Sequence, residues 1–282
     1  MTYDDETLRA LQLVELDVLK AIDSVCRKHG IAYFLDSGTA LGAARHQGFI
    51  PWDDDIDIGM LREDYERFLE LAPEELGSEY VVAKPGSLTG YAAMFSKVWK
   101  RGTVFQTQET MESGLPQGVF VDVFPYDPLH ADPLMREKQK AAGRRWQRIS
   151  YLYHAKTITV PHKGLLGAVE SLACRVAHHA VRAVLSEERI RKSFGWAERI
   201  GYESPTEEFM CMSYVMDSGL PLDVLMPPSS LRFEDAEFSC PHNTPAYLEA
   251  VFGSGWTELP PLDQRRNHAP IVLDLGAGTI ER

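Results

Sequence analysis

Four aspartates crowd into five positions of the segment WDDDIDIGM, and their spacing matches the needs of a metal site. They are Asp53, Asp54, Asp55 and Asp57. In a β-strand, residues two apart face the same side, with Cα atoms about 6.5–7 Å apart. Asp55 and Asp57 would therefore present two parallel carboxylates, while Ile56 and Ile58 enter the core. Such oxygen ligands on a rigid backbone suit Mg²⁺ or Mn²⁺.

A third acid is expected to join this pair. Asp122 stands alone among apolar residues in the strand-like segment FVDVF, and burying a carboxylate without a partner is costly. A cation shared with Asp55 and Asp57 would remove that cost. Asp122 would then be a ligand, or the base that takes a proton from an attacking hydroxyl. Asp53 would extend the row if the strand began early, whereas Asp54 faces away and is expected to be a loop or cap residue.

The preceding segment LDSGTALG has the composition of an anion-binding loop. Gly38 allows a ligand to approach the backbone closely, and the hydroxyl of Ser37 or Thr39 could cap the helix that follows. Arg45, further along that helix, could bind a phosphate through two hydrogen bonds. Lys97 is a second candidate phosphate clamp, although a solvent-facing strand residue would explain it equally well.

Aromatic and histidine side chains near these segments are further candidates for substrate contacts. If the transferred group carries a quaternary ammonium, it needs aromatic faces. Rings close in sequence to the acids are those of Trp52, Trp99, Phe124 and Tyr126. His46 and His268 are candidate substrate-binding residues, although a single loop histidine is more often structural.

Two other interpretations of the acidic run remain open. Asp53, Asp55 and Asp57 have the D-x-D-x-D spacing that opens an EF-hand calcium loop, but the loop's glycine position holds Ile58 and its glutamate position holds Asp64. A purely structural acidic turn would leave Asp122 unexplained. The four cysteines are far apart and form no C-x-x-C pair, so we assign no zinc and expect reduced thiols.

The elements that must position these residues follow from periodicity. Residues 5–29 read as an amphipathic helix ended by Gly30, with a strip made of Leu8, Leu11, Glu15, Val18, Leu19, Ile22, Val25 and Cys26. Residues 62–72 form a second such helix. Strands are expected at 31–35, 55–60, 80–83, 92–100 and 118–125.

The middle and the end of the chain differ from this alternating pattern. Residues 131–205 read as a helical insertion within one catalytic domain that spans 1–282, interrupted by a loop at 153–164. A helix near 164–186 carries an apolar strip from Leu165 to Val184. The end of the chain holds proline-rich loops and a short helix at 246–252. The predicted fold class is α+β, with a mixed sheet flanked by helices.

Charge and hydropathy limit the partners. The net charge of −12 argues against a nucleic-acid partner, and no apolar run is long enough to span a membrane. The acidic start of the chain is unlike a signal peptide, which favours a cytoplasmic location. Residues 136–200 hold 14 Lys and Arg against 5 Asp and Glu, a net +9 that leaves −21 elsewhere. This basic segment is either a solvated helical surface or a site for an anionic acceptor or the inner membrane face.

Three blocks of the sequence resemble the LicD family of bacterial phosphocholine transferases, which are related to fukutin. They are SGTALGAARHQGFIPWDDDIDIGM with EDYERF, GVFVDVFPYDPL, and LRFEDAEFSCPHNTPAYLEAVFGSGWTELPPLDQRRNH. In the last block, Phe252 stands where the family more often has tyrosine. The resemblance implies a nucleotidyltransferase-like fold, a phosphate loop at Gly38 and Thr39, and a metal site at Asp55, Asp57 and Asp122.

The same resemblance implies the reaction. A CDP-alcohol such as CDP-choline would donate a phospho-alcohol to a sugar hydroxyl on a cell-surface glycan, such as a teichoic acid, or on its lipid-linked precursor, and CMP would be released. Three alternatives stay open at this point. They are the transfer of ribitol or glycerol phosphate, a true nucleotidyltransferase that releases pyrophosphate, and a calcium- or carbohydrate-binding module without activity.

Overall fold

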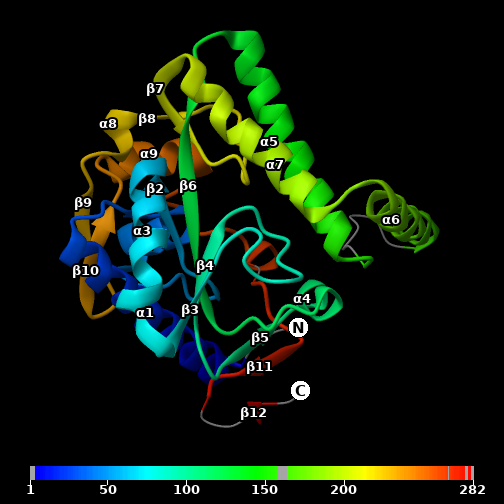
Figure 1. Ribbon diagram of the computed structural model, residues 1–282. Helices are drawn as coiled ribbons and strands as arrows, with labels where there is room; N and C mark the ends of the chain where they lie inside the picture. Colours follow the sequence, from blue (N-terminus) through cyan, green and yellow to red (C-terminus); the bar gives the residue numbers. More distant parts are fainter. Residues whose placement is uncertain (1–3, 158–163, 266, 277–278, 281–282) are drawn as a thin grey trace.

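The computed structural model describes residues 4–157, 164–265, 267–276 and 279–280, and these form an α+β fold around one mixed sheet (Figure 1). The sheet order is β1 (Phe34–Leu35), β2 (Asp57–Leu61), β6 (Phe120–His130), β4 (Ser96–Lys100) and β3 (Tyr80–Ala83). Strand β2 runs parallel to β6, whereas β1, β3 and β4 pair antiparallel with their neighbours. The predicted α+β class with a mixed sheet is confirmed.

Strand β6 is the longest strand of the described residues, and its two halves pair with different strands. Its first half pairs with β2 and β4, and its second half pairs with β7 (Pro205–Met210), which in turn pairs with β8 (Leu220–Pro221). All eleven residues of β6 are buried. The expected strand at 118–125 is therefore too short, because the chain stays extended through two prolines and β7 covers the continuation.

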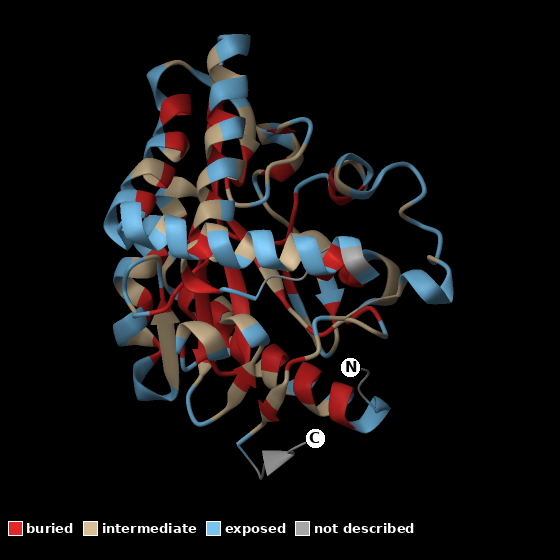
Figure 2. Cartoon of the chain, turned by 90° about the vertical axis from the view of Figure 1, so that its right-hand side faces the viewer, coloured by how far each residue is buried: buried red, intermediate tan, exposed pale blue. Residues whose placement is uncertain are grey.

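Helices flank the sheet and supply its hydrophobic packing. α1 (Asp5–His29) ends as predicted at Gly30, whose φ of 61° is the left-handed conformation that glycine adopts without strain. α2 (Ser37–His46), α3 (Arg62–Glu75) and α9 (Thr244–Phe252) surround the strands near β2. Buried residues gather around the strands and on the inner helix faces, as Figure 2 shows.

Smaller elements close the ends of the structure. A hairpin of β9 (Ser229–Phe233) and β10 (Ala236–Cys240) forms within the proline-rich stretch near the end of the chain. β5 (Val104–Gln106), β11 (Val272–Asp274) and β12 (Thr279–Ile280) form a separate small sheet. The remaining short elements are α4 (Gln108–Ser113), α8 (Leu222–Leu225) and the 3-10 turns at Gly77–Glu79, Gly201–Glu203 and Leu262–Gln264. The four cysteines are free.

The basic middle of the chain forms three helices beside this body. α5 (Pro133–His154) and α7 (Glu187–Ile200) pack side by side, and α6 (Gly164–Val184) stands off to one side (Figure 1). The predicted loop at 153–164 lies partly outside the described residues. Among the described residues, no helix is long and apolar enough to cross a membrane.

The apolar strip of α6 faces outward. Its described members Val169, Leu172, Val176 and Val184 are 59–71% exposed. A helix that leaves its apolar side in contact with water usually has a partner for it. The side chain of Leu165 lies outside the described residues.

Candidate functional site

Three charged side chains lie in one row across the middle of the sheet. In the ladder between β2 and β6, Asp57 stands opposite Asp122, and in the ladder between β6 and β4, Asp122 stands opposite Lys97. Neighbouring strands are about 4.8 Å apart, and aligned residues face the same side. Lys97 Nζ lies 2.5 Å from Asp122 Oδ1. The sheet therefore places Lys97, which the sequence left ambiguous, beside Asp57 and Asp122, which the sequence assigned to one metal site.

The first turn of α2 fixes the start of β2. The amide of Asp57 donates to Thr39 Oγ1 at 2.9 Å, and the Asp57 carbonyl accepts from the amide of Asp36 at 2.9 Å. Thr39 is buried. In the structure, Thr39 Oγ1 holds the backbone of the acid-bearing strand, and its contact with phosphate stays a prediction.

The helix cap differs from the prediction. The N-cap of α2 is Asp36, which accepts from the amide of Ser37 at 2.7 Å, so neither Ser37 nor Thr39 is the cap. Asp36 also accepts from Tyr126 Oη at 2.8 Å and from the hydroxyl of Tyr247. A carboxylate binds the helix start better than a hydroxyl does, because it adds charge near the positive end of the helix.

Gly38 is required at its place beside the acidic run. A Cβ on this residue would lie 2.8 Å from Asp53 Oδ2, a separation that real Cβ atoms essentially never show. The neighbour that needs this space in the structure is the carboxylate of Asp53, and the close approach of a ligand to Gly38 stays a prediction.

Asp54 is part of the acidic group, which contradicts the expectation that it faces away. It is fully buried and accepts from the backbone amide of His268 at 2.7 Å. His268 Nδ1 lies 3.4 Å from Asp54 Oδ1 and 3.4 Å from Asp55 Oδ2. Strand β2 starts at Asp57, so Asp54 and Asp55 lie in an extended loop where strict alternation does not apply. The C-terminal segment thus binds directly to the acids.

Carboxylates in this group carry raised pKa values. Burial raises the pKa of Asp57 well above its usual range, and the charges of Asp55 and Asp122 raise it further. Burial also raises the pKa of Asp122 to about 6, although the ammonium of Lys97 opposes this shift. The pKa of Asp53 is raised to about 8 by burial and by Asp55. In each case burial is the main cause of the raised pKa, and the negative charge of neighbouring carboxylates adds to it.

The acidic group as a whole fits a divalent cation. Its members are Glu15, Asp53, Asp54, Asp55, Asp57 and Asp122. The cations that act on them, among the described residues, are Lys97 and His268. The hydrogen bond to Asp54 raises the pKa of His268 to about 9. This excess of hard oxygen donors is the chemistry that Mg²⁺ or Mn²⁺ takes.

The side chains are gathered somewhat differently from the predicted ligand set. Within the described part of the chain, the group whose ligand atoms all lie within 4.8 Å of one another is Asp54, Asp55 and His268. Lys97 binds Asp122 in the same arrangement. Asp55, Asp57 and Asp122 stay the predicted metal ligands. Asp54, which was expected to face away, and His268, a predicted substrate-binding residue, lie beside Asp55 in the structure.

Glu15 is an acid of this site that the sequence did not single out. It lies on α1, is fully buried, and neither carboxylate oxygen has a hydrogen-bond partner among the described residues. Burial raises its pKa, and Asp55, Asp54 and Asp53 raise it further. The available signal was an acid at an inward position of the apolar strip.

A cavity of about 210 Å³ lies against this row of charges. Asp55, Asp122, Lys97 and His268 line it together with Glu109 of α4. Its aromatic walls are formed by Tyr91, Phe95, Phe105, Phe120, Tyr151 and Tyr214. The arrangement joins carboxylates, a lysine and aromatic faces in one concave space.

The aromatic residues expected near the substrate lie elsewhere. Trp99 and Phe124 are buried in the core, and Tyr126 is bound to Asp36. The guanidinium of Arg265 lies 4.5 Å from the ring centre of Trp52. None of these four rings lines the cavity beside the acids. Nearness in sequence was a poor guide, since the rings that line the cavity come mostly from other segments.

Arg45 and His46 lie at the far end of α2 and do not line the cavity. Arg45 Nη1 donates to the carbonyls of Trp256 and Glu258, each at 2.9 Å. Burial lowers the pKa of His46, and the charge of Arg45 lowers it further. Arg45 thus holds the C-terminal loop in this structure, and its role toward phosphate stays a prediction.

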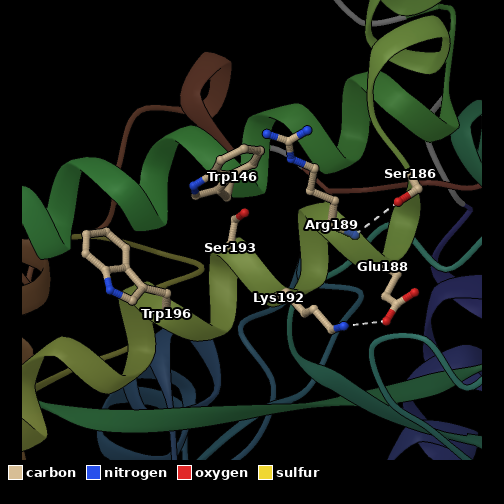
Figure 3. A pocket seen from close by; sticks show the side chains of 7 residues that line it. All are labelled: Trp146, Ser186, Glu188, Arg189, Lys192, Ser193 and Trp196. Atoms are coloured by element: carbon tan, nitrogen blue, oxygen red, sulfur yellow. Dashed lines mark hydrogen bonds and ion pairs between the residues drawn. The ribbon is translucent and has the colours of Figure 1, made fainter.

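A second, larger hollow of about 570 Å³ lies between α5 and α7 (Figure 3). Two indoles, Trp146 and Trp196, stand on one side of it. Its carboxylate, Glu188, is paired with Lys192 at 2.6 Å, and Ser186 caps α7. This hollow lacks the grouped carboxylates of the sheet site, so we place the candidate active site at the sheet.

Comparison with known proteins finds a family match over part of the chain. Residues 30–166 match the family described as LicD/FKTN/FKRP, nucleotidyltransferase domain. This region contains Gly38, Thr39, Asp55, Asp57 and Asp122. It does not contain Glu15 of α1 or His268.

Individual relatives match over part of their length. The chain is 35% identical over 154 residues to the lipopolysaccharide cholinephosphotransferase LicD of Haemophilus influenzae, which covers 50% of this chain and 57% of that protein. It is 33% identical over 124 residues to the human ribitol 5-phosphate transferase FKRP, covering 43% of this chain and 21% of that protein. An uncharacterized protein of Rickettsia typhi, RT0683, is 46% identical over 66 residues, covering 23% of this chain and 21% of that protein.

The chain thus spans little more than half of the Haemophilus relative, and about a fifth of the human and rickettsial ones. Residues 30–166, slightly less than half of the chain, are similar to the nucleotidyltransferase domain of the family described as LicD/FKTN/FKRP.

Proposed function

We propose that this protein transfers a phospho-alcohol, phosphocholine, from a CDP-alcohol to a sugar hydroxyl of a cell-surface glycan or its lipid-linked precursor. The observation that supports this best is the aligned row of Asp57, Asp122 and Lys97 beside a cavity with aromatic walls. The relatives add support, because their names are those of a cholinephosphotransferase and of ribitol-phosphate transferases.

The proposed step is an in-line displacement. The acceptor oxygen forms a bond to the β-phosphorus, the bond from that phosphorus to the bridging oxygen breaks, and CMP leaves with the bridging oxygen. Asp122 accepts the hydroxyl proton, since its pKa of about 6 keeps it ionised yet basic at neutral pH. Lys97 holds Asp122 in place and offers positive charge to the phosphate oxygens.

Asp55 and Asp57 would hold Mg²⁺ or Mn²⁺, which neutralises the charge of the diphosphate during such transfers. Gly38 and Thr39 help to fix the positions of these acids. Gly38 leaves room for Asp53, and Thr39 holds the amide of Asp57. Both roles act on the positions of the acids and do not need direct contact with phosphate.

The cavity favours choline over ribitol as the transferred alcohol. Its six aromatic rings offer π-faces, which bind quaternary ammonium groups. A ribitol chain brings several hydroxyls, and each of them would need a hydrogen-bond partner in the cavity. Its volume of about 210 Å³ suits a head group better than a whole nucleotide, since pockets for larger ligands span roughly 300–1,000 Å³.

Product analysis tests this proposal. The protein would be incubated with Mg²⁺, an acceptor extract of glycan and lipid-linked glycan, and either CDP-choline, CDP-ribitol, CDP-glycerol or an NTP. We expect CMP from CDP-choline in excess of the other donors, and transfer of labelled choline to the acceptor. Pyrophosphate release from an NTP would identify a true nucleotidyltransferase instead. Release of neither product would contradict the enzymatic proposal.

The basic insertion adds a proposal about location. We propose that the outward apolar strip of α6 contacts an anionic membrane surface on the cytoplasmic side, where a lipid-linked acceptor would be found. Residues 136–200 carry a net +9 on an otherwise acidic chain, which favours this face toward anionic lipid. Flotation with anionic vesicles should recover the protein, and Val176→Asp should reduce that recovery. Equal recovery with neutral vesicles would contradict the charge argument.

A further inference from the structure

One carboxylate of the cavity has no partner in the structure. Glu109 lies in the first turn of α4 and lines the cavity beside the acids. Its carboxylate makes no hydrogen bond or ion pair with any residue that the structure describes. Burial raises the pKa of Glu109 to about 7, an effect that the charge of Lys97 only partly opposes. An acid left in this state is costly unless a ligand compensates it.

Another glutamate on the same short helix shows the contrast. Glu112 Oε2 accepts from the amides of Lys156 and Thr157 at 2.9 Å each, and Glu112 Oε1 accepts from Gln108 Nε2 at 2.9 Å. These contacts join α4 to the chain that follows α5. Glu112 therefore has a structural role, whereas Glu109 contributes nothing comparable to the fold.

Polar groups around Glu109 are already engaged. The hydroxyls of Thr107 and Thr110 form the capping box of α4, and Gln117 Nε2 donates to the Phe105 carbonyl. Tyr91 Oη donates to the Phe95 carbonyl at 2.8 Å. These four side chains are therefore engaged within the protein, which leaves the Glu109 carboxylate and the aromatic rings to hold a cation in this part of the cavity.

The aromatic rings already bind one cation in this way. Lys97 Nζ lies 3.6 Å from the ring centre of Phe120 and 5.2 Å from that of Phe95. The further rings, those of Tyr91, Tyr151 and Tyr214, line the same cavity as Glu109. Tyr151 and Glu109 are close enough for the carboxylate to raise the pKa of Tyr151, in addition to the larger effect of burial.

We propose that Glu109, with the rings of Tyr91, Tyr151 and Tyr214, binds the quaternary ammonium of the transferred alcohol. The inference rests on the proposed function and adds to it a residue that determines donor specificity. In phosphocholine, two carbons separate the quaternary nitrogen from the phosphate ester oxygen. A head group held at Glu109 would therefore keep its phosphate within the cavity that Asp55 and Asp122 also line.

The first test measures binding without catalysis. Isothermal titration with phosphocholine would compare the wild type, Glu109→Gln, Glu109→Asp and the control Glu112→Gln, with thermal melts to show that each is folded. We expect roughly tenfold weaker binding for Glu109→Gln, equal to about 1.4 kcal/mol, near wild-type binding for Glu112→Gln, and partial retention for Glu109→Asp. Unchanged binding in a folded Glu109→Gln would overturn the inference.

The second test separates this inference from the proposed function. Initial rates of CMP release would be measured with CDP-choline and with CDP-ribitol for the same variants. For Glu109→Gln we expect a KM for CDP-choline raised roughly tenfold, with kcat little changed, and no change toward CDP-ribitol.

Equal losses on both donors would assign Glu109 a structural role and overturn the inference alone. If the wild type binds phosphocholine through Glu109 but releases no CMP from any donor, the proposed function fails while the ammonium site stands. The two failures are therefore distinguishable.

Discussion

Strand β6 carries two buried aspartates five residues apart, and they differ in how their charge is balanced. Asp127 accepts two hydrogen bonds from Arg62, at 2.8 and 2.6 Å, and one from Tyr202. Arg62 also binds Glu198 of α7 at 2.6 Å. Asp122 has Lys97 as its partner, but its neighbours Asp55 and Asp57 add negative charge.

The difference separates a structural cluster from a functional one. At Asp127, the guanidinium of Arg62 lies between two carboxylates and links β6, α3 and α7. Its role is therefore structural. At Asp122, one ammonium stands among several acids, so the local charge is unbalanced. Folding alone gains nothing from such an excess, whereas a cation or a phosphate with its cation would use it.

The largest expected effect comes from removing an unbalanced acid. Asp57→Asn should lower CMP release by at least about 10²–10³-fold, because a carboxylate proposed to hold the cation that neutralises the diphosphate is lost. The free energy of unfolding should stay equal or rise, since a buried carboxylate with a raised pKa has gone. Initial rates and urea unfolding measure the two quantities. Undiminished activity would remove Asp57 from the site.

Removing a charge from the cluster of Asp127, Arg62 and Glu198, called the balanced cluster below, should lower stability and leave activity nearly unchanged. Arg62→Ala leaves Asp127, which is fully buried, without its cation. We expect a loss of about 3–5 kcal/mol in the free energy of unfolding. Activity per folded molecule should change little, because Arg62 follows the far end of β2 from Asp57. A stable but inactive Arg62→Ala protein would show that the two clusters are not separate in function.

Sequence reasoning could propose the residues whose roles are indicated by their immediate neighbours along the chain. Asp55 and Asp57 were predicted from their two-residue spacing, and Asp122 was predicted because an isolated acid between apolar strand residues needs a partner. The ladders place Asp57 beside Asp122. The α+β class and the end of α1 at Gly30 followed from periodicity in the same way.

Residues from distant segments were beyond that reasoning. Tyr151 of α5 and Tyr214 reach the cavity from parts of the chain far from the acids, and no local pattern encodes such a contact. His268 was named as a candidate substrate-binding residue, but its contacts with Asp54 and Asp55 were not predicted. Lys97 was left ambiguous because a strand position does not reveal its cross-strand partner. Register between β4 and β6 decides that partner, and it depends on the packing of the whole sheet.

Glu15 offers a smaller test of the same contrast. Glu15→Met should raise the free energy of unfolding by about 1–3 kcal/mol, because a buried carboxyl without a hydrogen bond is replaced by an apolar chain of similar length. Gln12 is a control on the same helix, since its Nε2 donates to the Asp53 carbonyl at 2.9 Å, and Gln12→Met should be destabilising. A destabilised Glu15→Met would mean that this acid belongs to the fold.

The smallest expected effect is on how the stability of the folded protein depends on pH, and on how Mg²⁺ alters that dependence. Asp53 and Asp122 have pKa values raised to about 8 and about 6, so the folded protein holds protons that the unfolded chain has released. Stability without Mg²⁺ should therefore be highest below about pH 4 for these groups and fall as pH rises toward 8. His268, with a pKa of about 9, adds a loss in the same direction between about pH 6.5 and 9.

Mg²⁺ competes with those protons, so its stabilising effect should grow with pH. Melting temperatures with and without Mg²⁺ at pH 5.5, 7.0 and 8.5 should show a difference that widens at each step. Glu198 of the balanced cluster also has a pKa raised to about 7, and its contribution is the same with and without the ion, so it cancels in the difference. Asp57→Asn should abolish the widening, whereas Arg62→Ala should keep it at a lower melting temperature. A Mg²⁺ effect independent of pH would show that the ion does not bind at the unbalanced acids.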